Sequence, residues 1–366
     1  MPTVEETVNF VLAADTMDER VNRIRLVPQH HGTGDHATIY AALAREAYVQ
    51  HLAPDFAYVH QNDFYDLPYF SEVYEVADTA TNGFIDISVD DLIRVLLADS
   101  RTLLVFRTVL GLTKDEFAHS TKILADRDGL SSISGGRVDG MERKGSAVSK
   151  SQATVVARTI SEVLVGSLFG DPPGSVRRKQ DKPDTVEGWK TVATLAREGV
   201  PYSYLLHQRH YGGAFRQLLD ATSTRRGDVI EDAVETLFSE NGIPYVRTGS
   251  HNQSDIETRF GVRVTPAPDF VVYDNSGALR AMLECKGAND GGTARDKALR
   301  FKKLHDESIR LGGIPLLAVL GGIGWSRVND TLGPVVGDTD GRVFTLKNLP
   351  SMLQVQPFPA LLDTAE

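Results

Sequence analysis

Apolar side chains recur with two different spacings along this chain, and each spacing indicates a different kind of element. Within residues 1–125 apolar positions recur every three or four residues, most clearly over 91–112, which predicts a mainly helical region. A further helix is predicted around residues 155–164. Between these regions, residues 126–151 are rich in Gly, Ser and charged side chains, and we expect an exposed connection there.

The pattern changes toward the C-terminus, where short β-rich runs follow an amphipathic helix. The helix is expected over residues 228–240, the β-rich runs over 268–273, 279–286 and 314–320, and a second helix between the last two runs. This order is typical of an α/β domain. We therefore expect a helical domain over 1–125, a linker and helical middle region with basic loops over 126–217, and an α/β domain over 218–366.

Composition narrows the class of protein. The chain has 366 residues, 41% of them hydrophobic and 24% charged, which suits a globular protein with a real core. Its longest apolar stretch, residues 314–325, is too short for a bilayer, which takes roughly 20 residues, and the first ten residues are acidic, unlike a secretory signal. Cys285 is the only cysteine, so no intrachain disulfide can form. These features predict a cytoplasmic protein.

The net charge of −10 hides an uneven distribution. The first 100 residues carry 5 basic and 17 acidic groups, whereas residues 141–230 carry 14 basic and 9 acidic groups. A basic segment in an acidic protein can still face a polyanion, because salt screens charges more than roughly 10 Å away. A mixed, solvated surface is the alternative interpretation.

Candidate chemistry lies in the two neighbouring β-rich runs. Side chains alternate faces along a strand, so Glu284 and Lys286 should point to the same side as Met282. Residues 274–277 (Asp-Asn-Ser-Gly) predict a hairpin turn, which would bring Asp269 close to them. Two close carboxylates repel each other unless a cation lies between them, and hard oxygen ligands suit Mg²⁺. Such a site could hydrolyse a phosphodiester with metal assistance, Lys286 holding a water.

The spacing of these residues resembles a known signature. Pro268-Asp269, fourteen residues and then Glu284-Cys285-Lys286 is similar to the motif of the PD-(D/E)XK nuclease superfamily. The run that follows, residues 289–304, resembles segments of type II restriction endonucleases. The resemblance covers roughly residues 218–320 and implies a restriction-endonuclease-like α/β core, with a mixed sheet flanked by helices.

The resemblance also implies roles for particular residues. Asp269 and Glu284 would bind Mg²⁺, and Lys286 would orient the attacking water. A helix before the central strands often adds one more acidic residue in this superfamily; Glu231 matches that position, and Glu235 is the second choice. Family membership would further imply 5′-phosphate and 3′-hydroxyl ends, a homodimer that cuts both strands of DNA, and a cognate DNA methyltransferase in the same cell.

Several basic residues are candidate contacts to the DNA backbone. A Gly-Gly turn at 291–292 leads into a predicted helix, where backbone N–H groups, Arg295 and Lys297 could approach a phosphate. Further candidates lie in a Pro/Gly-rich loop and just before the predicted helix at 228–240: Arg177, Arg178, Lys179, Arg225 and Arg226. Solvated surface charge is the alternative for each of them.

Base recognition could lie in the helical region. Residues 101–124 resemble the first helix pair of repressor-like helix-turn-helix domains, with Gly111 at the turn and a Thr113–Glu116 capping box opening the second helix. The glycine-rich sequence that follows does not predict the third helix of that motif. A helix pair packed only for structure remains an alternative.

Three functions are consistent with these observations. The first is a Mg²⁺-dependent, sequence-specific double-strand DNA endonuclease of the type II restriction class. The second is a DNA-binding regulator whose nuclease-like domain is inactive. The third is a repair or modification-dependent nuclease.

Overall fold

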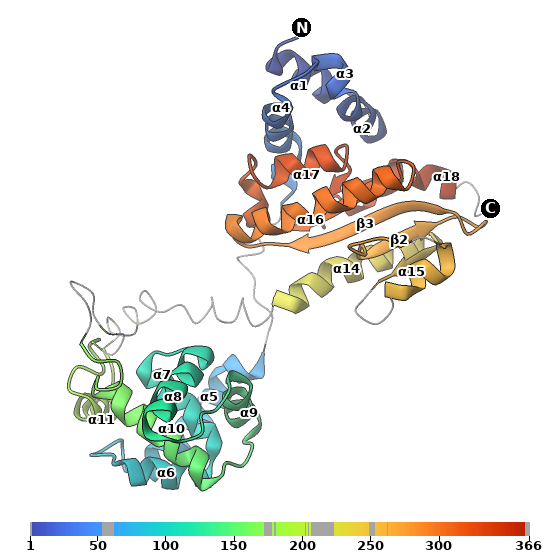
Figure 1. The fold of residues 1–366 in the computed structure, drawn as a ribbon. Helices are drawn as coiled ribbons and strands as arrows, with labels where there is room; N and C mark the ends of the chain where they lie inside the picture. The colour runs from blue at the N-terminus through green and yellow to red at the C-terminus, as the bar shows by residue number, and fades with distance from the viewer. Residues whose placement is uncertain are drawn as a thin grey trace. The chain divides into compact units, whose positions relative to one another are not determined.

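The computed structural model describes residues 2–52, 62–171, 178, 181–201, 203, 205, 223–248, 253–261 and 263–362 (Figure 1). The chain divides into two compact units. The first consists of Met1–His60 together with Leu219–Glu366, and the second of Gln61–Leu218. The boundary at 218–219 lies one residue from the expected division at 217–218, whereas the other boundary falls at 60–61 and not at 125, because the first helices of the chain pack with the C-terminal unit.

A five-stranded mixed sheet forms the centre of the first unit. Its strands lie in sequence order: β1 (Tyr245–Arg247), β2 (Phe270–Tyr273), β3 (Leu279–Gly287), β4 (Leu316–Gly321) and β5 (Val343–Phe344). The pairs β1–β2 and β2–β3 are antiparallel, whereas β3–β4 and β4–β5 are parallel. The three expected β-rich runs are thus confirmed as β2, β3 and β4, and the protein is a mixed α/β structure.

The hairpin between β2 and β3 is stabilised by its own turn residues. Asp274 Oδ1 accepts hydrogen bonds from the backbone N–H groups of Ser276 (2.9 Å) and Ala278 (3.0 Å). Gly277 has a φ of 82°, a conformation that glycine adopts without steric cost. The turn fixes the register in which Phe270 faces Leu283, and this register brings the end of β3 beside the start of β2.

Helices cover both faces of the sheet. The helices of this unit are α1 (Val4–Leu12), α2 (Met17–Arg25), α3 (Val27–His31), α4 (His36–Leu43), α14 (Ser223–Glu240), α15 (Gln253–Phe260), α16 (Gly291–Arg310), α17 (Leu332–Asp338) and α18 (Phe358–Leu362). On one face α14 packs against Leu283, Cys285 and Val319. On the other face Phe301 of α16 packs in one core with Ala318.

The N-terminal helices join this unit through close packing of α4 on α17. A Cβ at Gly333 would lie 3.0 Å from the Ala41 Cα, and one at Gly337 would lie 2.9 Å from the Tyr40 ring. Only glycine leaves room for so close an approach. The buried side chains Ile39 and Leu43 then share a core with the covering helices of the sheet.

A glycine also allows α14 to pack closely on the sheet. A Cβ at Gly321, the last residue of β4, would lie 2.7 Å from the Ile230 Cδ1. Ile230, Val234 and Phe238 are buried, as the apolar spacing of this helix predicts. Because Ile230 is held against the ends of β3 and β4, the neighbouring Glu231 lies near the same edge of the sheet.

The second unit is helical in its described residues. Its helices are α5 (Leu67–Ala80), α6 (Val89–Ala98), α7 (Leu103–Leu110), α8 (Lys114–Asp128), α9 (Gly135–Lys144), α10 (Lys150–Leu164) and α11 (Trp189–Glu198). The predicted Thr113–Glu116 capping box at the start of α8 is confirmed, with Gly111 in the left-handed conformation before it. The helix predicted near 155–164 is confirmed as α10.

One sequence expectation fails in this unit. Residues 135–144 form α9, whereas we expected an exposed connection and no third helix. The Ser134 side chain accepts a hydrogen bond from the Arg137 N–H and so caps the helix, and Val138 and Met141 are buried. The two glycines at the start of α9 have low helix propensity, so the sequence did not predict this helix, which tertiary packing stabilises. In the described part of the chain, no helix is long and apolar enough to cross a membrane.

Candidate active site

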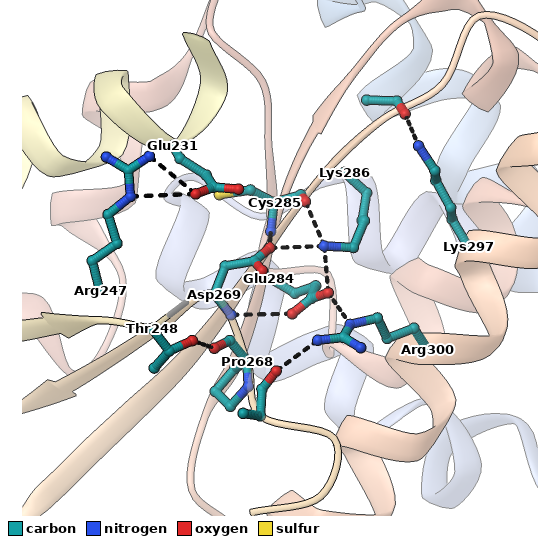
Figure 2. A network of polar contacts seen from close by, with 12 residues as sticks. Glu231, Arg247, Thr248, Pro268, Asp269, Glu284, Cys285, Lys286, Lys297 and Arg300 are labelled. Carbon is teal, nitrogen blue, oxygen red and sulfur yellow. Dashed lines mark hydrogen bonds and ion pairs between the residues drawn. The ribbon is translucent and has the colours of Figure 1, made fainter. Parts of the chain in front are cut away.

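Asp269, Glu284 and Lys286 meet where the β2–β3 hairpin opens, as the sequence predicted (Figure 2). The Lys286 Nζ lies 2.8 Å from the Asp269 Oδ2 and 2.5 Å from the Glu284 Oε1. Glu284 and Lys286 lie two positions apart on β3, so their side chains leave the same face of the strand. Asp269 stands directly before β2, and antiparallel pairing brings it beside Cys285.

Glu284 is a completely buried carboxylate surrounded by donors. Its Oε1 accepts hydrogen bonds from Lys286 and from the Arg300 Nε, and its Oε2 accepts one from the Asp269 N–H at 3.2 Å. Burial raises the pKa of this carboxyl and the nearby Asp269 charge adds to the rise, whereas Lys286 and Arg300 oppose it. A buried carboxylate is tolerated only when it is paired in this way.

The backbone around Asp269 is held from two sides. The Thr248 N–H donates to the Asp269 carbonyl oxygen at 2.8 Å, and the Thr248 hydroxyl donates to the Pro268 carbonyl. From the other side, the Arg300 Nη2 donates to the Ala267 carbonyl at 2.6 Å. The Asp269 Oδ2 itself accepts the Cys285 N–H at 2.8 Å. The carboxylate is therefore fixed before any ligand arrives.

Lys286 is held in its charged form. Burial works against the ammonium, but the charges of Glu284 and Asp269 outweigh burial and raise the Lys286 pKa. At neutral pH the side chain is therefore a positive hydrogen-bond donor. It also donates to the Cys285 carbonyl at 2.8 Å.

Glu231 lies at the edge of this group and is paired with another residue. Its Oε2 is 3.1 Å from the Arg247 Nη2, and Arg247 also binds Asp232 (2.7 Å) and Glu235 (2.5 Å). Burial raises the Glu231 pKa, and the Asp269 charge raises it further. The other candidate glutamate, Glu235, is bound to Arg247 and to the Tyr245 hydroxyl.

The donor atoms present suit a hard divalent cation. Three oxygens, the Asp269 Oδ2, the Glu284 Oε1 and the Cys285 carbonyl oxygen, all lie within 2.8 Å of the single Lys286 Nζ. Carboxylate and carbonyl oxygens are ligands of Mg²⁺. Among the described residues, no three His, Cys, Asp or Glu side chains are grouped so that they could hold a metal ion. The residues fit Mg²⁺ as two carboxylates and one carbonyl, provided that the ammonium gives way.

The basic residues predicted to contact DNA are spread over several elements, unlike Asp269, Glu284 and Lys286, which meet at one place. Arg295 is exposed on α16 and lies 3.9 Å from Asp296. Lys297 donates to the Gly287 carbonyl at the end of β3; in Figure 2 it lies to the right of Lys286, on the side away from Asp269. Arg178 pairs with Asp181 in the second unit at 2.9 Å. Arg225 is exposed in the first turn of α14. Arg177, Lys179 and the side chain of Arg226 lie outside the described residues.

Two arginines that contact the candidate site were not assigned to it from the sequence. Arg300 reaches Glu284 from α16, and Arg247 reaches Glu231 from β1. Arg300 follows Lys297 by three positions, so both lie on the same side of α16 toward the end of β3. That spacing is the one signal that could have found Arg300. No comparable spacing in the sequence points to Arg247.

Comparison with protein-family models, curated proteins and solved structures found no match to this chain.

Proposed function

We propose that this protein is a Mg²⁺-dependent double-strand DNA endonuclease of the type II restriction class. One observation carries the proposal: Asp269, Glu284 and Lys286 converge within hydrogen-bonding distance at the ends of two paired strands. The Glu284 carboxylate is buried, the Asp269 carboxylate is half-buried and held by hydrogen bonds, and the Asp269 charge helps to raise the Glu284 pKa, which is the arrangement expected of a site that binds a cation.

Each side chain would have a distinct task. Asp269 and Glu284 would hold the metal ion, with the Cys285 carbonyl as a further oxygen ligand. A bound Mg²⁺ would offset charge growing on the phosphate and lower the pKa of the attacking water. Lys286, being protonated, would orient that water and donate to a phosphate oxygen. Glu231 would act from the edge of the site, and the products would carry 5′-phosphate and 3′-hydroxyl ends.

The substrate proposal rests on charge and on the helical unit. Arg295 on α16 and Arg225 on α14 are exposed basic residues on helices of the unit that holds the site, where they could contact phosphates. In the second unit, α7, Gly111 and α8 precede a third helix, α9, so three successive helices are present where a helix-turn-helix would need them. That unit would read the recognition sequence.

Cutting both strands requires two sites, so the proposal includes a two-fold homodimer whose symmetry matches that of a palindromic DNA site. A restriction enzyme also requires a DNA methyltransferase in the same cytoplasm to protect the genome. The dimer is tested by sedimentation of the full chain with and without DNA.

Incubation of plasmid and phage DNA with the full-length protein tests the central proposal. We expect discrete fragments with Mg²⁺, none with EDTA, and none from Asp269→Asn under either condition. Sequencing of the fragment ends would reveal the recognition sequence. Intact DNA at all Mg²⁺ and Mn²⁺ concentrations, with a well-folded protein, would overturn the proposal.

A second candidate function is a DNA-binding regulator with an inactive nuclease-like domain. The observation that favours it is the pairing of Glu284 with two basic side chains, Lys286 and Arg300, which satisfies this carboxylate without metal. A gel shift in EDTA without cleavage in Mg²⁺ would support the regulator. Cleavage restricted to methylated or damaged plasmid would instead indicate a repair or modification-dependent nuclease.

A further inference from the structure

Arg300 occupies the oxygen of Glu284 that a metal ion would need. The Arg300 Nε donates to the Glu284 Oε1, the same atom that accepts the Lys286 ammonium. The other oxygen, Oε2, already accepts the Asp269 N–H. A cation that binds the Oε1 must therefore compete with two positive groups at a single atom.

Arg300 also joins the two halves of the site. Its Nη2 donates to the Ala267 carbonyl at 2.6 Å, two residues before Asp269, while its Nε holds Glu284 on β3 (Figure 2). The side chain is anchored on α16, where the neighbouring Ala298 and Phe301 are buried. One guanidinium thus keeps the segment before β2 and the carboxylate of β3 in a fixed relation.

Arg300 differs from Lys286 in its access to solvent. The Arg300 side chain is 35% exposed, whereas the Lys286 side chain is 20% exposed and the Glu284 side chain that both contact is 0% exposed. A partly exposed arginine can move its head group to a new anion without a change in the backbone, because the long side chain has several rotatable bonds. A guanidinium binds a phosphate as it binds a carboxylate, through charge-assisted and often bidentate hydrogen bonds.

We propose that Arg300 is a positioning residue that closes the metal site when DNA is absent and opens it when a phosphodiester takes its guanidinium. In the closed state Arg300 holds Glu284 and lowers the affinity of the site for a divalent cation by charge repulsion. In the open state the guanidinium binds a DNA phosphate, and the Glu284 Oε1 becomes available. Metal binding and DNA binding then favour each other, as linkage requires. This inference rests on the proposed function.

The test is Mn²⁺ binding to the full-length protein without DNA, measured by calorimetry and by the electron paramagnetic resonance signal of free Mn²⁺. Arg300→Gln should bind Mn²⁺ about tenfold more tightly than the wild type, because a positive charge that competes for the Glu284 Oε1 has been removed. Arg300→Lys keeps the charge and should stay within about threefold of the wild type.

A matched control comes from the same helix. Arg310 is exposed, pairs with Glu307, and lies ten residues from Arg300, roughly 15 Å along the helix. Arg310→Gln removes the same charge beyond the screening distance of roughly 8–10 Å, so its Mn²⁺ affinity should equal that of the wild type. Circular dichroism confirms that each variant is folded before binding is compared.

The outcomes separate this inference from the proposed function. If Arg300 only supports the fold of the site, Arg300→Gln and Arg300→Lys should both bind Mn²⁺ more weakly, which would overturn the inference alone. If Glu284→Gln binds Mn²⁺ as well as the wild type does, the metal is not held at Glu284, and the proposed function fails with the inference. A second measurement adds a DNA duplex in Ca²⁺: the gain in metal affinity that DNA produces should be smaller in Arg300→Gln than in the wild type.

Discussion

The ammonium of Lys286 lies 2.8 Å from the carboxylate of Asp269, a residue 17 positions earlier in the chain. The contact exists because β2 and β3 are antiparallel and because the Asp274 turn fixes their register. Asp269 also accepts the Cys285 N–H, so its orientation does not depend on the lysine alone. Lys286 can therefore be replaced without loss of the carboxylate geometry, which makes it a good position for testing function.

Lys286→Ala is expected to remove cleavage and leave the fold intact. The Glu284 carboxylate would keep Arg300 as a partner, so the site should not collapse. Loss of the positive donor should slow plasmid cleavage by about 1,000-fold or more, whereas a gel shift in EDTA should show DNA binding within about threefold of the wild type. Lys302→Ala, an exposed substitution on α16, is the control. Near-normal cutting by Lys286→Ala would remove this residue from the catalytic group.

Glu231→Gln should reduce cleavage less severely than Lys286→Ala. Glu231 lies at the edge of the site, where burial and the Asp269 charge raise its pKa and where Arg247 holds it. A residue in such an outer position commonly contributes about tenfold or somewhat more. Glu235→Gln, which alters another partner of Arg247, should change the rate by less than about threefold. Equal rates for Glu231→Gln and the wild type would exclude Glu231 from the site.

Asp338 should make the first unit less stable as pH rises from about 4 to about 7. Burial raises the Asp338 pKa to about 6 from an ordinary 3.8, although His305 and Lys302 partly oppose the rise. A carboxyl whose folded pKa is raised contributes stability that is complete below its unfolded pKa and is lost as pH rises through its folded pKa. Asp338→Asn removes the cost of the buried charge. Its gain in unfolding free energy should be about 1–3 kcal/mol larger at pH 8 than at pH 4.

Urea unfolding at the two pH values measures this difference. Asp296→Asn is the control, since the Asp296 side chain is 77% exposed, and it should change stability by less than about 0.5 kcal/mol at either pH. A gain from Asp338→Asn that is the same at pH 4 and pH 8 would show that Asp338 is not buried as a charge.

The ion pair between Arg107 and Glu142 should stabilise the helical unit. Both nitrogen–oxygen distances are 2.6 Å, the two side chains are buried, and Arg107 also donates to the Leu112 carbonyl at 2.8 Å. Arg107→Met would leave a buried carboxylate without its partner and should cost about 3–5 kcal/mol in the urea transition of this unit. Addition of Glu142→Leu should recover part of that loss.

The control for the ion pair is a surface pair in the same unit. Arg94 and Asp91 are 3.0 Å apart, with side chains 61% and 41% exposed. Arg94→Ala should therefore cost less than about 1 kcal/mol, because water screens exposed charges. Equal losses from Arg107→Met and Arg94→Ala would contradict the structural role assigned to the buried pair.

The sequence alone predicted what depends on local periodicity. Alternation along one strand determines that Glu284 and Lys286 share a face, and the Asp274–Gly277 turn determines that Asp269 returns beside them. The helical spacing of Ile230, Val234 and Phe238 likewise indicated which side of α14 is buried. These features follow from residues within about 20 positions of one another, where backbone geometry leaves few choices.

Only the tertiary structure decided which groups from separately packed elements complete the site and the units. Arg247 and Arg300 are each only 16 residues from their carboxylates, but no hairpin turn or strand alternation joins them: each pair comes from a helix and a strand whose docking depends on side-chain packing. Helices α1 to α4 join a sheet formed more than 200 residues later, because Gly333 and Gly337 leave room for α4. Such contacts produce no periodic pattern of apolar and polar residues from which they could be predicted. They arise when buried surfaces fit together, and that fit depends on the whole chain at once.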